Sequence, residues 1–86
     1  EELGKKIILL DNLNLLVDKI EFENEILVKV RSTGKLLIGK IIFKNQNMAE
    51  VYLKIEEDGI SPGQACVFYK QDEFGYKVLG GGWIKS

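Results

Sequence analysis

Short apolar runs that alternate along the chain, separated by turn residues, are the feature of this sequence that most constrains its fold. Ile26, Val28 and Val30, for example, fall on one face of an extended segment. A period of two residues is typical of a β-strand with one buried face, and no long stretch carries a helical repeat. We therefore expect a chain built almost entirely from strands.

Six runs are predicted to form strands, and turn residues separate them. These runs are 5–10, 25–31, 37–44, 51–56, 65–69 and 76–80. In the fourth run, Val51, Leu53 and Ile55 are expected to share the buried face. The segment 11–22 is ambiguous, and it favours a helical turn near 13–16 followed by an extended stretch toward Phe22.

Closure of this sheet is the simplest way to protect its edges. In 86 residues, six strands make a single small domain, and an open sheet would leave two edges unpaired. Gly34 accepts the positive φ of a tight hairpin turn, and Gly39 permits a sharp bend on the apolar face. We predict an all-β fold, a six-stranded antiparallel β-barrel.

Several kinds of chemistry are excluded by composition. The chain has no histidine and one cysteine, so nucleophile–base pairs and ordinary zinc sites are not available. Cys66 lies in an apolar run and is expected to be a buried small hydrophobe. A lone cysteine fits a reducing, cytoplasmic setting, and no apolar run of membrane-spanning length is present. We predict a non-catalytic domain without a metal or cofactor of its own.

Three consecutive glycines precede the only tryptophan, Trp83, near the end of the chain. A phosphate-binding loop would need GxxxxGK[ST] followed by a helix, and neither follows the run 80–82. We therefore expect a bulge or a close backbone approach at these glycines. Tyr52, Tyr69 and Trp83 could stack on bases, but packing in the core or over a barrel end is the more ordinary expectation.

Charge is unevenly placed although the formal net charge is only −1. The segment 29–54 holds six basic residues against one acid, Glu50, which gives a local net charge of +5. The basic residues are Lys29, Arg31, Lys35, Lys40, Lys44 and Lys54. A solvated strand face explains such a segment, and so does a small phosphate-contacting surface.

Two terminal motifs, "SPGQACVFY" at 61–69 and "VLGGGWI" at 78–84, carry a family resemblance. Weaker matches are "LNLL" at 13–16 and "VKVRSTGK" at 28–35. Together they resemble the C-terminal domain of the bacterial tRNA-specific 2-thiouridylases, the MnmA/TrmU family. The resemblance implies a small β-barrel similar to the second domain of elongation factor Tu.

The resemblance also implies a larger parent enzyme. That enzyme would use ATP in an N-terminal domain and transfer persulfide sulfur to the wobble uridine of tRNA. The implied partners are tRNA, the N-terminal ATP-binding domain and a sulfur-donor protein, with no membrane. ATP is implied only for the parent enzyme.

Three residues occupy positions that contact tRNA in that family, namely Arg31, Ser32 and Gln64. Ser32 stands where tyrosine is usual, so a ring contact is lost there. The planar fork of Arg31 can grip phosphate oxygens, and the Gln64 amide can reach a phosphate or a 2′-hydroxyl. Lys29 and Lys35 are further candidates for phosphate contacts. An exposed strand cation at Arg31 and a local hydrogen bond at Gln64 remain open alternatives.

Two other functions remain open at this point. A protein-interaction or linking barrel of a translation-related protein, without RNA contact, also fits the near-zero net charge. A flavin-binding barrel is suggested only by the string Pro-Gly-Gln at 62–64.

Overall fold

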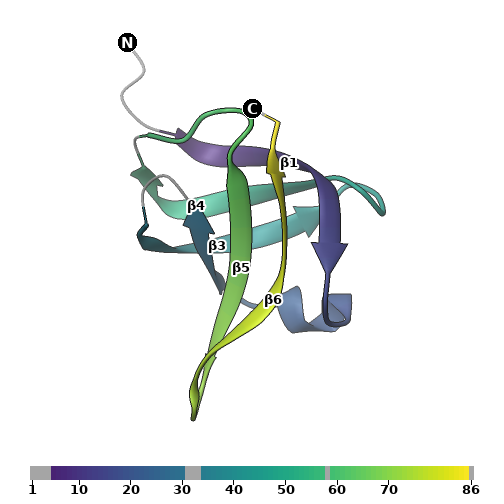
Figure 1. Cartoon of the computed structure of the whole chain (residues 1–86), viewed down its shortest axis with the longest axis vertical. Coiled ribbons are helices and arrows are strands. Elements are labelled where there is room, and N and C mark those ends of the chain that lie inside the picture. Colours follow the sequence, from purple (N-terminus) through teal and green to yellow (C-terminus); the bar gives the residue numbers. More distant parts are fainter. Residues whose placement is uncertain (1–4, 31–33, 58, 86) are drawn as a thin grey trace.

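The structure, a computed structural model, describes residues 5–30, 34–57 and 59–85. Six strands and one 3₁₀ turn follow one another along the chain (Figure 1). They are β1 (Lys5–Leu15), η1 (Lys19–Phe22), β2 (Ile26–Val30), β3 (Leu36–Phe43), β4 (Ala49–Glu57), β5 (Ala65–Asp72) and β6 (Gly75–Ile84).

The strands close into a barrel in the order β1-β4-β3-β2-β5-β6, and every neighbouring pair is antiparallel. The predicted all-β, six-stranded antiparallel barrel is thus confirmed. Hairpins join β2 to β3, β3 to β4 and β5 to β6, as the turn residues predicted. Gly34 has a φ of 70°, and Asn45 Oδ1 stabilises the β3–β4 turn by accepting from the Asn47 and Met48 backbone N–H groups at 2.8 and 2.9 Å.

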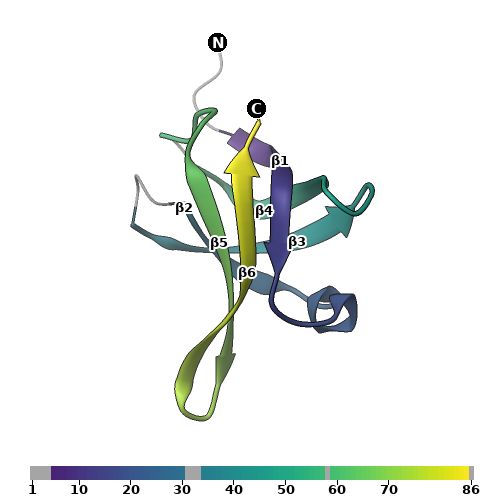
Figure 2. The same ribbon diagram turned by 45° about the vertical axis from the view of Figure 1, so that its right-hand side comes forward.

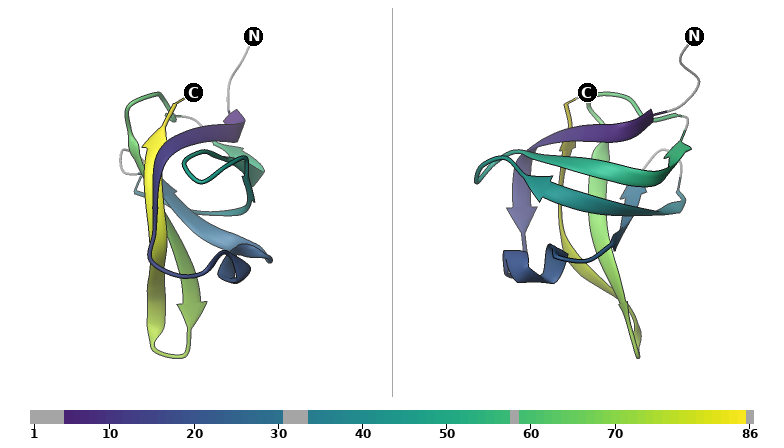
Figure 3. Two further views of the ribbon diagram at one scale, coloured as in Figure 1. Left: turned by 90° about the vertical axis from the view of Figure 1, so that its right-hand side faces the viewer. Right: turned by 180° about the vertical axis from the view of Figure 1, so that it is seen from behind.

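β1 closes the barrel because it bends and pairs with two different strands. Its first half, Ile7–Leu10, pairs with β4, and its second half, Leu10–Leu15, pairs with β6. Between the two halves, Asn12 has a φ of 51° and the register with β6 shifts. Figure 3 shows this purple strand curving across the barrel.

Two expectations for the segment 11–22 are wrong. The first strand does not end at Leu10, and 13–16 is not a helical turn, because pairing with β6 keeps the backbone extended to Leu15. The helical turn lies later, as η1, where an extended stretch was predicted. A bend inside a strand was therefore misinterpreted as the strand's end.

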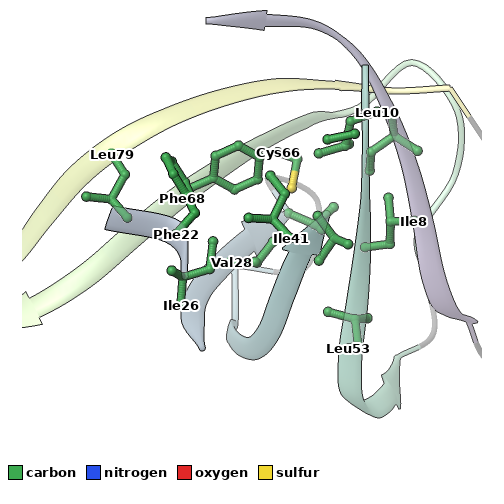
Figure 4. Packing of buried hydrophobic residues seen from close by; sticks show 14 of the residues in the cluster. Ile8, Leu10, Phe22, Ile26, Val28, Ile41, Leu53, Cys66, Phe68 and Leu79 are labelled. Carbon is green, nitrogen blue, oxygen red and sulfur yellow. The ribbon is translucent and has the colours of Figure 1, made fainter. Parts of the chain in front are cut away.

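The core is a single apolar cluster enclosed by the barrel (Figure 4). Phe22 from η1 plugs one end, and its ring meets the Phe43 and Phe68 rings edge-on at centroid distances of 5.3 and 5.7 Å. Gly39 is buried on the inner face, where a β-carbon would lie 3.0 Å from the Tyr52 carbonyl oxygen. This close approach leaves little room for a side chain at Gly39, whereas the bend expected there stays a prediction.

Ile55 does not join Val51 and Leu53 in the core, contrary to prediction. Its side chain is 77% exposed, whereas Val51 and Leu53 are buried. The register between β1 and β4 shifts after Ile7↔Tyr52, so that Lys5 pairs with Glu57. Such an irregularity breaks the two-residue alternation and turns Ile55 outward.

The β5–β6 hairpin extends beyond the rest of the barrel, as Figure 2 shows. At its tip, Asp72 Oδ1 accepts a hydrogen bond from the Phe74 backbone N–H at 2.8 Å, and Gly75 has a φ of 126°. The Phe74 side chain is 92% exposed. This hairpin therefore carries an apolar tip that the barrel does not cover.

Candidate functional site

Two of the predicted site residues, Arg31 and Ser32, lie outside the described residues. The strand that precedes them is defined to Val30, which pairs with Cys66 of β5. This pairing places the end of β2 beside the beginning of β5.

Gln64 closes the bend that leads into β5. Its Oε1 atom accepts a hydrogen bond from the Ser61 backbone N–H at 3.1 Å. Its backbone carbonyl accepts from the Ile84 N–H at 2.9 Å, and the Gly63 N–H donates to the Ile84 carbonyl at 2.8 Å. Gly63 has a φ of 89°, which suits glycine. The bend is therefore fastened to the end of β6.

The Gln64 side chain is only partly used by this local structure. Within the part of the chain that the structure describes, its Nε2 amide group makes no hydrogen bond, and the residue is half-buried. The local hydrogen bond expected as one alternative is present, through Oε1. The free Nε2 group remains able to donate to a ligand.

Lys29 lies on the neighbouring strand at the same end of the barrel. It pairs with Val67, three residues after Gln64, and with Leu36 of β3. Because Val28 and Val30 are buried, the Lys29 side chain is on the outer face. No carboxylate within 4 Å of its ammonium group is found among the described residues. Lys29 on β2 and Gln64 in the bend before β5 thus offer a cation and an amide donor on adjacent segments of the chain's outer surface.

The positive charge of Lys35 is partly balanced by a nearby carboxylate, which the sequence did not indicate. Its Nζ atom lies 3.5 Å from Glu57 Oε2, and Lys44 Nζ lies 3.8 Å from Glu50 Oε2. In both pairs the lysine side chain is more than half exposed and the glutamate side chain is not, and both pairs lower the local positive potential. Glu57 lies outside 29–54, so the count of +5 overstated the field at this surface.

The glycine run lies in β6 and has a structural role, as predicted. Gly80 has a φ of 146°, and a β-carbon there would overlap the Asn14 carbonyl oxygen. A β-carbon on Gly81 would lie 2.7 Å from the Cys66 carbonyl oxygen. These glycines therefore let β1, β5 and β6 approach closely. Because they belong to a paired strand, they do not form a loop that could cradle the phosphates of ATP.

Tyr52 and Trp83 do not pack in the core or over a barrel end, contrary to prediction. They are 39% and 50% exposed on the outer face, since their neighbours Val51 and Ile84 point inward. The Tyr52 hydroxyl donates to Glu50 Oε1 at 2.7 Å, and this hydrogen bond, with desolvation and the nearby charge, raises the pKa of Tyr52. Tyr69 is half-buried.

Trp83 borders a shallow depression of about 300 Å³ on the outer face of β1, β5 and β6, which we call the Trp83 hollow. It is lined by Asn12, Asn14, Leu16, Ala65, Val67, Val78, Gly80, Gly81, Gly82 and Trp83. Our sequence interpretation missed it, because the glycines were considered only for their backbone. The signal in the sequence was that Trp83 precedes Ile84 directly, because two neighbouring residues of a strand point to opposite faces and Ile84 is the one that is buried.

Cys66 is buried on the inner face, as expected. Burial raises the pKa of its thiol to about 12, so the nucleophilic thiolate is scarce near neutral pH. Among the residues that the structure describes, no three His, Cys, Asp or Glu side chains gather as they would around a metal ion. No helix in the described ranges has the length and hydropathy needed to cross a membrane.

Taken together, the fold and surface define a small closed antiparallel β-barrel domain with its available polar groups on the outside. The family model of the aminomethyltransferase β-barrel domain matches residues 5–84, and the chain belongs to this family. The terminal motifs predicted a resemblance to the C-terminal domain of 2-thiouridylases, and relatives similar in sequence confirm it.

The relatives are named tRNA-specific 2-thiouridylase MnmA. The protein of Paracoccus denitrificans is 42% identical over 86 residues, which cover 98% of this chain and 21% of the relative. The proteins of Beijerinckia indica and Orientia tsutsugamushi are 44% and 45% identical, each over 83% of this chain and over 16% and 17% of the relative. The chain thus spans about a fifth of the length of the curated relatives it matches.

Proposed function

We propose that this barrel is the tRNA-contacting accessory domain of a tRNA-specific 2-thiouridylase. The whole enzyme would use ATP and persulfide sulfur to thiolate the wobble uridine of tRNA in the cytoplasm. Its N-terminal ATP-binding domain and a sulfur-donor protein would be the partners of this chain. This part of the proposal rests on the name of the relatives and on the terminal motifs.

Within that enzyme, the barrel would supply no reacting group. The chain has no histidine, and burial raises the pKa of its one thiol to about 12. Nucleophilic or general acid–base chemistry needs a group that is accessible and titrates near the working pH. The contribution of this domain is therefore to hold the substrate.

The observation that carries the tRNA contact is the position of Gln64 beside the end of β2. Gln64 presents a free amide donor, and Lys29 presents a cation without a carboxylate partner among the described residues. Arg31 follows Val30 directly in the chain, and its guanidinium would add a bidentate phosphate contact. Ser32, which lies outside the described residues, and Lys35 are the further tRNA-contacting residues of the proposal. Such a set suits a sugar–phosphate backbone better than it suits a base.

The experiment is a titration of fluorescently labelled tRNA with the 86-residue chain at salt concentrations from 50 to 200 mM. Two or three phosphate contacts predict a slope of about −2 to −3 for log K against log salt. Lys29→Ala should weaken binding and make the slope shallower by about 1.

Lys44→Ala is the matched control, because it removes the same charge from the β3–β4 turn near the opposite end of the barrel. It should bind tRNA nearly as the unsubstituted chain does. Equal affinity of the Lys29→Ala variant and the unsubstituted chain would contradict the proposed surface.

A second candidate function is a protein-interaction barrel without RNA contact. The outer face of β1, β3 and β4 favours it, because four isoleucines are between 43% and 77% exposed there. They are Ile7, Ile38, Ile42 and Ile55. On this hypothesis the chain would show no salt-dependent affinity for tRNA, and Ile38→Lys would disrupt its binding to the rest of the parent enzyme.

A further inference from the structure

We propose that the Trp83 hollow binds an unpaired RNA base, stacked on the Trp83 indole with its edge toward Asn12 and Asn14. This inference rests on the proposed function, because it names the part of the tRNA that would lie next to Gln64. It concerns the outer face of β1, β5 and β6, away from the core.

The floor of the hollow is formed largely by residues with small side chains or none. Gly81 lies between Val67 of β5 and Asn14 of β1 in the strand register, and Ala65 lies opposite Trp83. Ala65 on β5 and the glycines of β6 are small, so the floor of the hollow is a surface on which a planar ring can rest. The glycines that allow close strand packing thus also clear this floor.

The Trp83 side chain borders the floor of the hollow and is half exposed, whereas its neighbour Ile84 is 2% exposed. An exposed indole offers an aromatic face on which a base can stack, and such stacking contributes about 1–3 kcal/mol per base. Trp83 belongs neither to the buried cluster nor to the residues packed against it, so packing of the core does not account for its position.

Asn12 and Asn14 supply polar groups on the β1 side of the hollow, and both are exposed. Each side-chain amide holds a donor and an acceptor, which match the mixed edges of bases. A positive φ at Asn12 and the register shift with β6 set this segment of β1 apart from a regular strand. The apolar floor therefore has hydrogen-bonding groups along one border.

The charges around the hollow fit a base with its phosphates toward β2. No carboxylate lines the hollow among the described residues, and the nearest acid in the register is Asp11, opposite Trp83 on β1. On the other side, Lys29 lies opposite Val67, and Gln64 precedes Ala65. A base on Trp83 would thus place its backbone near the cation and the amide, away from Asp11.

Trp83 is the only tryptophan, so its fluorescence reports directly on the hollow. We expect tRNA and an unstructured ten-nucleotide RNA each to quench this emission in a saturable manner. The midpoint should coincide with binding measured by anisotropy of labelled RNA. Trp83→Leu should weaken binding of the short RNA by about fivefold to a hundredfold, the equivalent of one stacked base.

Tyr76→Leu is the matched control, because Tyr76 is a 56% exposed aromatic on the hairpin outside the hollow. It should leave both quenching and affinity unchanged. Asn14→Asp keeps the Trp83 side chain and tests the hydrogen bonds to the edge of the base. It should weaken RNA binding severalfold. Circular dichroism and thermal unfolding should show that each variant is folded.

Salt-dependent tRNA binding without a change in Trp83 emission would overturn the base site and leave the proposed function standing. Loss of all tRNA binding would contradict both. If the remainder of the parent enzyme, added in trans, shifts the emission while RNA does not, the occupant is protein and the inference is wrong.

Discussion

A β-carbon on Gly80 would overlap the backbone carbonyl oxygen of Asn14, because β6 meets β1 there without space for a side chain. It would also lie 2.9 Å from the Leu15 Cα atom. Since both obstacles belong to the backbone, a rotamer change cannot relieve them. This contact lies at the place where β1 and β6 close the barrel.

We predict that Gly80→Ala destabilises the barrel more than any other single glycine-to-alanine change in its strands. It combines a φ of 146° with a backbone clash, whereas Gly75→Ala meets only the φ of 126° and no atom within 4 Å. Strain at such a φ costs about 1–3 kcal/mol, so Gly75→Ala should lose that much and Gly80→Ala more.

Urea unfolding of both variants measures the difference. Gly81→Ala, with a backbone obstacle at 2.7 Å and no positive φ, isolates the steric part. A smaller loss for Gly80→Ala than for Gly75→Ala would contradict the close strand approach described above.

Phe22 is expected to hold η1 against the open end of the barrel. Its ring is 3% exposed and meets two other phenylalanine rings edge-on. Phe22→Ala should therefore lower the free energy of unfolding by about 3–5 kcal/mol. Phe74→Ala makes the same chemical change at a 92% exposed tip, and it should stay within about 0.5 kcal/mol.

Thermal unfolding followed by circular dichroism compares these two variants directly. In a domain of this size, 1 kcal/mol corresponds to about 4–8 °C in Tm. Equal shifts of Tm in the two phenylalanine variants would show that Phe22 does not pack into the end of the barrel in solution.

Cys66 should make the fold sensitive to alkaline pH. Its pKa is raised from 9.0 to about 12 in the folded state by burial, so the folded protein keeps a proton that the unfolded chain releases. Below pH 9 the thiol is protonated in both states, and its contribution to the free energy of unfolding is fully present. As the pH rises from about 9 toward 12, the free energy of unfolding falls by up to about 1.4 kcal/mol per pH unit, because only the unfolded chain releases the proton.

The measurement is the difference in unfolding free energy between the natural chain and Cys66→Ala at pH 8 and at pH 10.5. The natural chain should lose stability relative to the variant over this interval. In addition, a thiol reagent at pH 8 should react with Cys66 only after urea is added. Rapid labelling of the folded chain would refute its burial.

Gln64 permits stability and RNA binding to be separated. Gln64→Glu keeps an oxygen acceptor for the Ser61 N–H, so the bend should remain as stable as before. It replaces the free amide donor with a negative charge, so tRNA affinity should fall severalfold. Gln64→Ala should lower both, with a stability loss of about 0.5–1.5 kcal/mol. A Gln64→Glu variant with full tRNA affinity would remove Gln64 from the site.

The strands were predictable because their alternation is a local property of the sequence. Val28, Val51 and Cys66 lie inside as the two-residue period indicated, and Gly34 adopts the positive φ that the turn required. The second half of β1 was not predictable in this way. Asp11-Asn12 has the residues of a turn, and only pairing with β6 keeps the chain extended beyond it.

The candidate site was predictable only in part, for a similar reason. Gln64 was identified from a motif, but its link to Lys29 depends on the register between β2 and β5. The ion pair of Lys35 with Glu57 joins residues 22 positions apart, and charge counting along the chain does not reveal it. The Trp83 hollow needs three strands side by side, so no single segment encodes it.

The most direct test of the central claim is a map of backbone amide chemical shifts of the ¹⁵N-labelled chain during titration with tRNA. We predict progressive changes at Lys29, Gln64 and Ala65, with Lys44 and Phe74 unaffected. The changes should reverse when the salt concentration is raised to 0.5 M, because phosphate contacts are screened. Unchanged signals at Lys29 and Gln64, or equal changes over the whole barrel, would contradict a tRNA-contacting surface at this end of the domain.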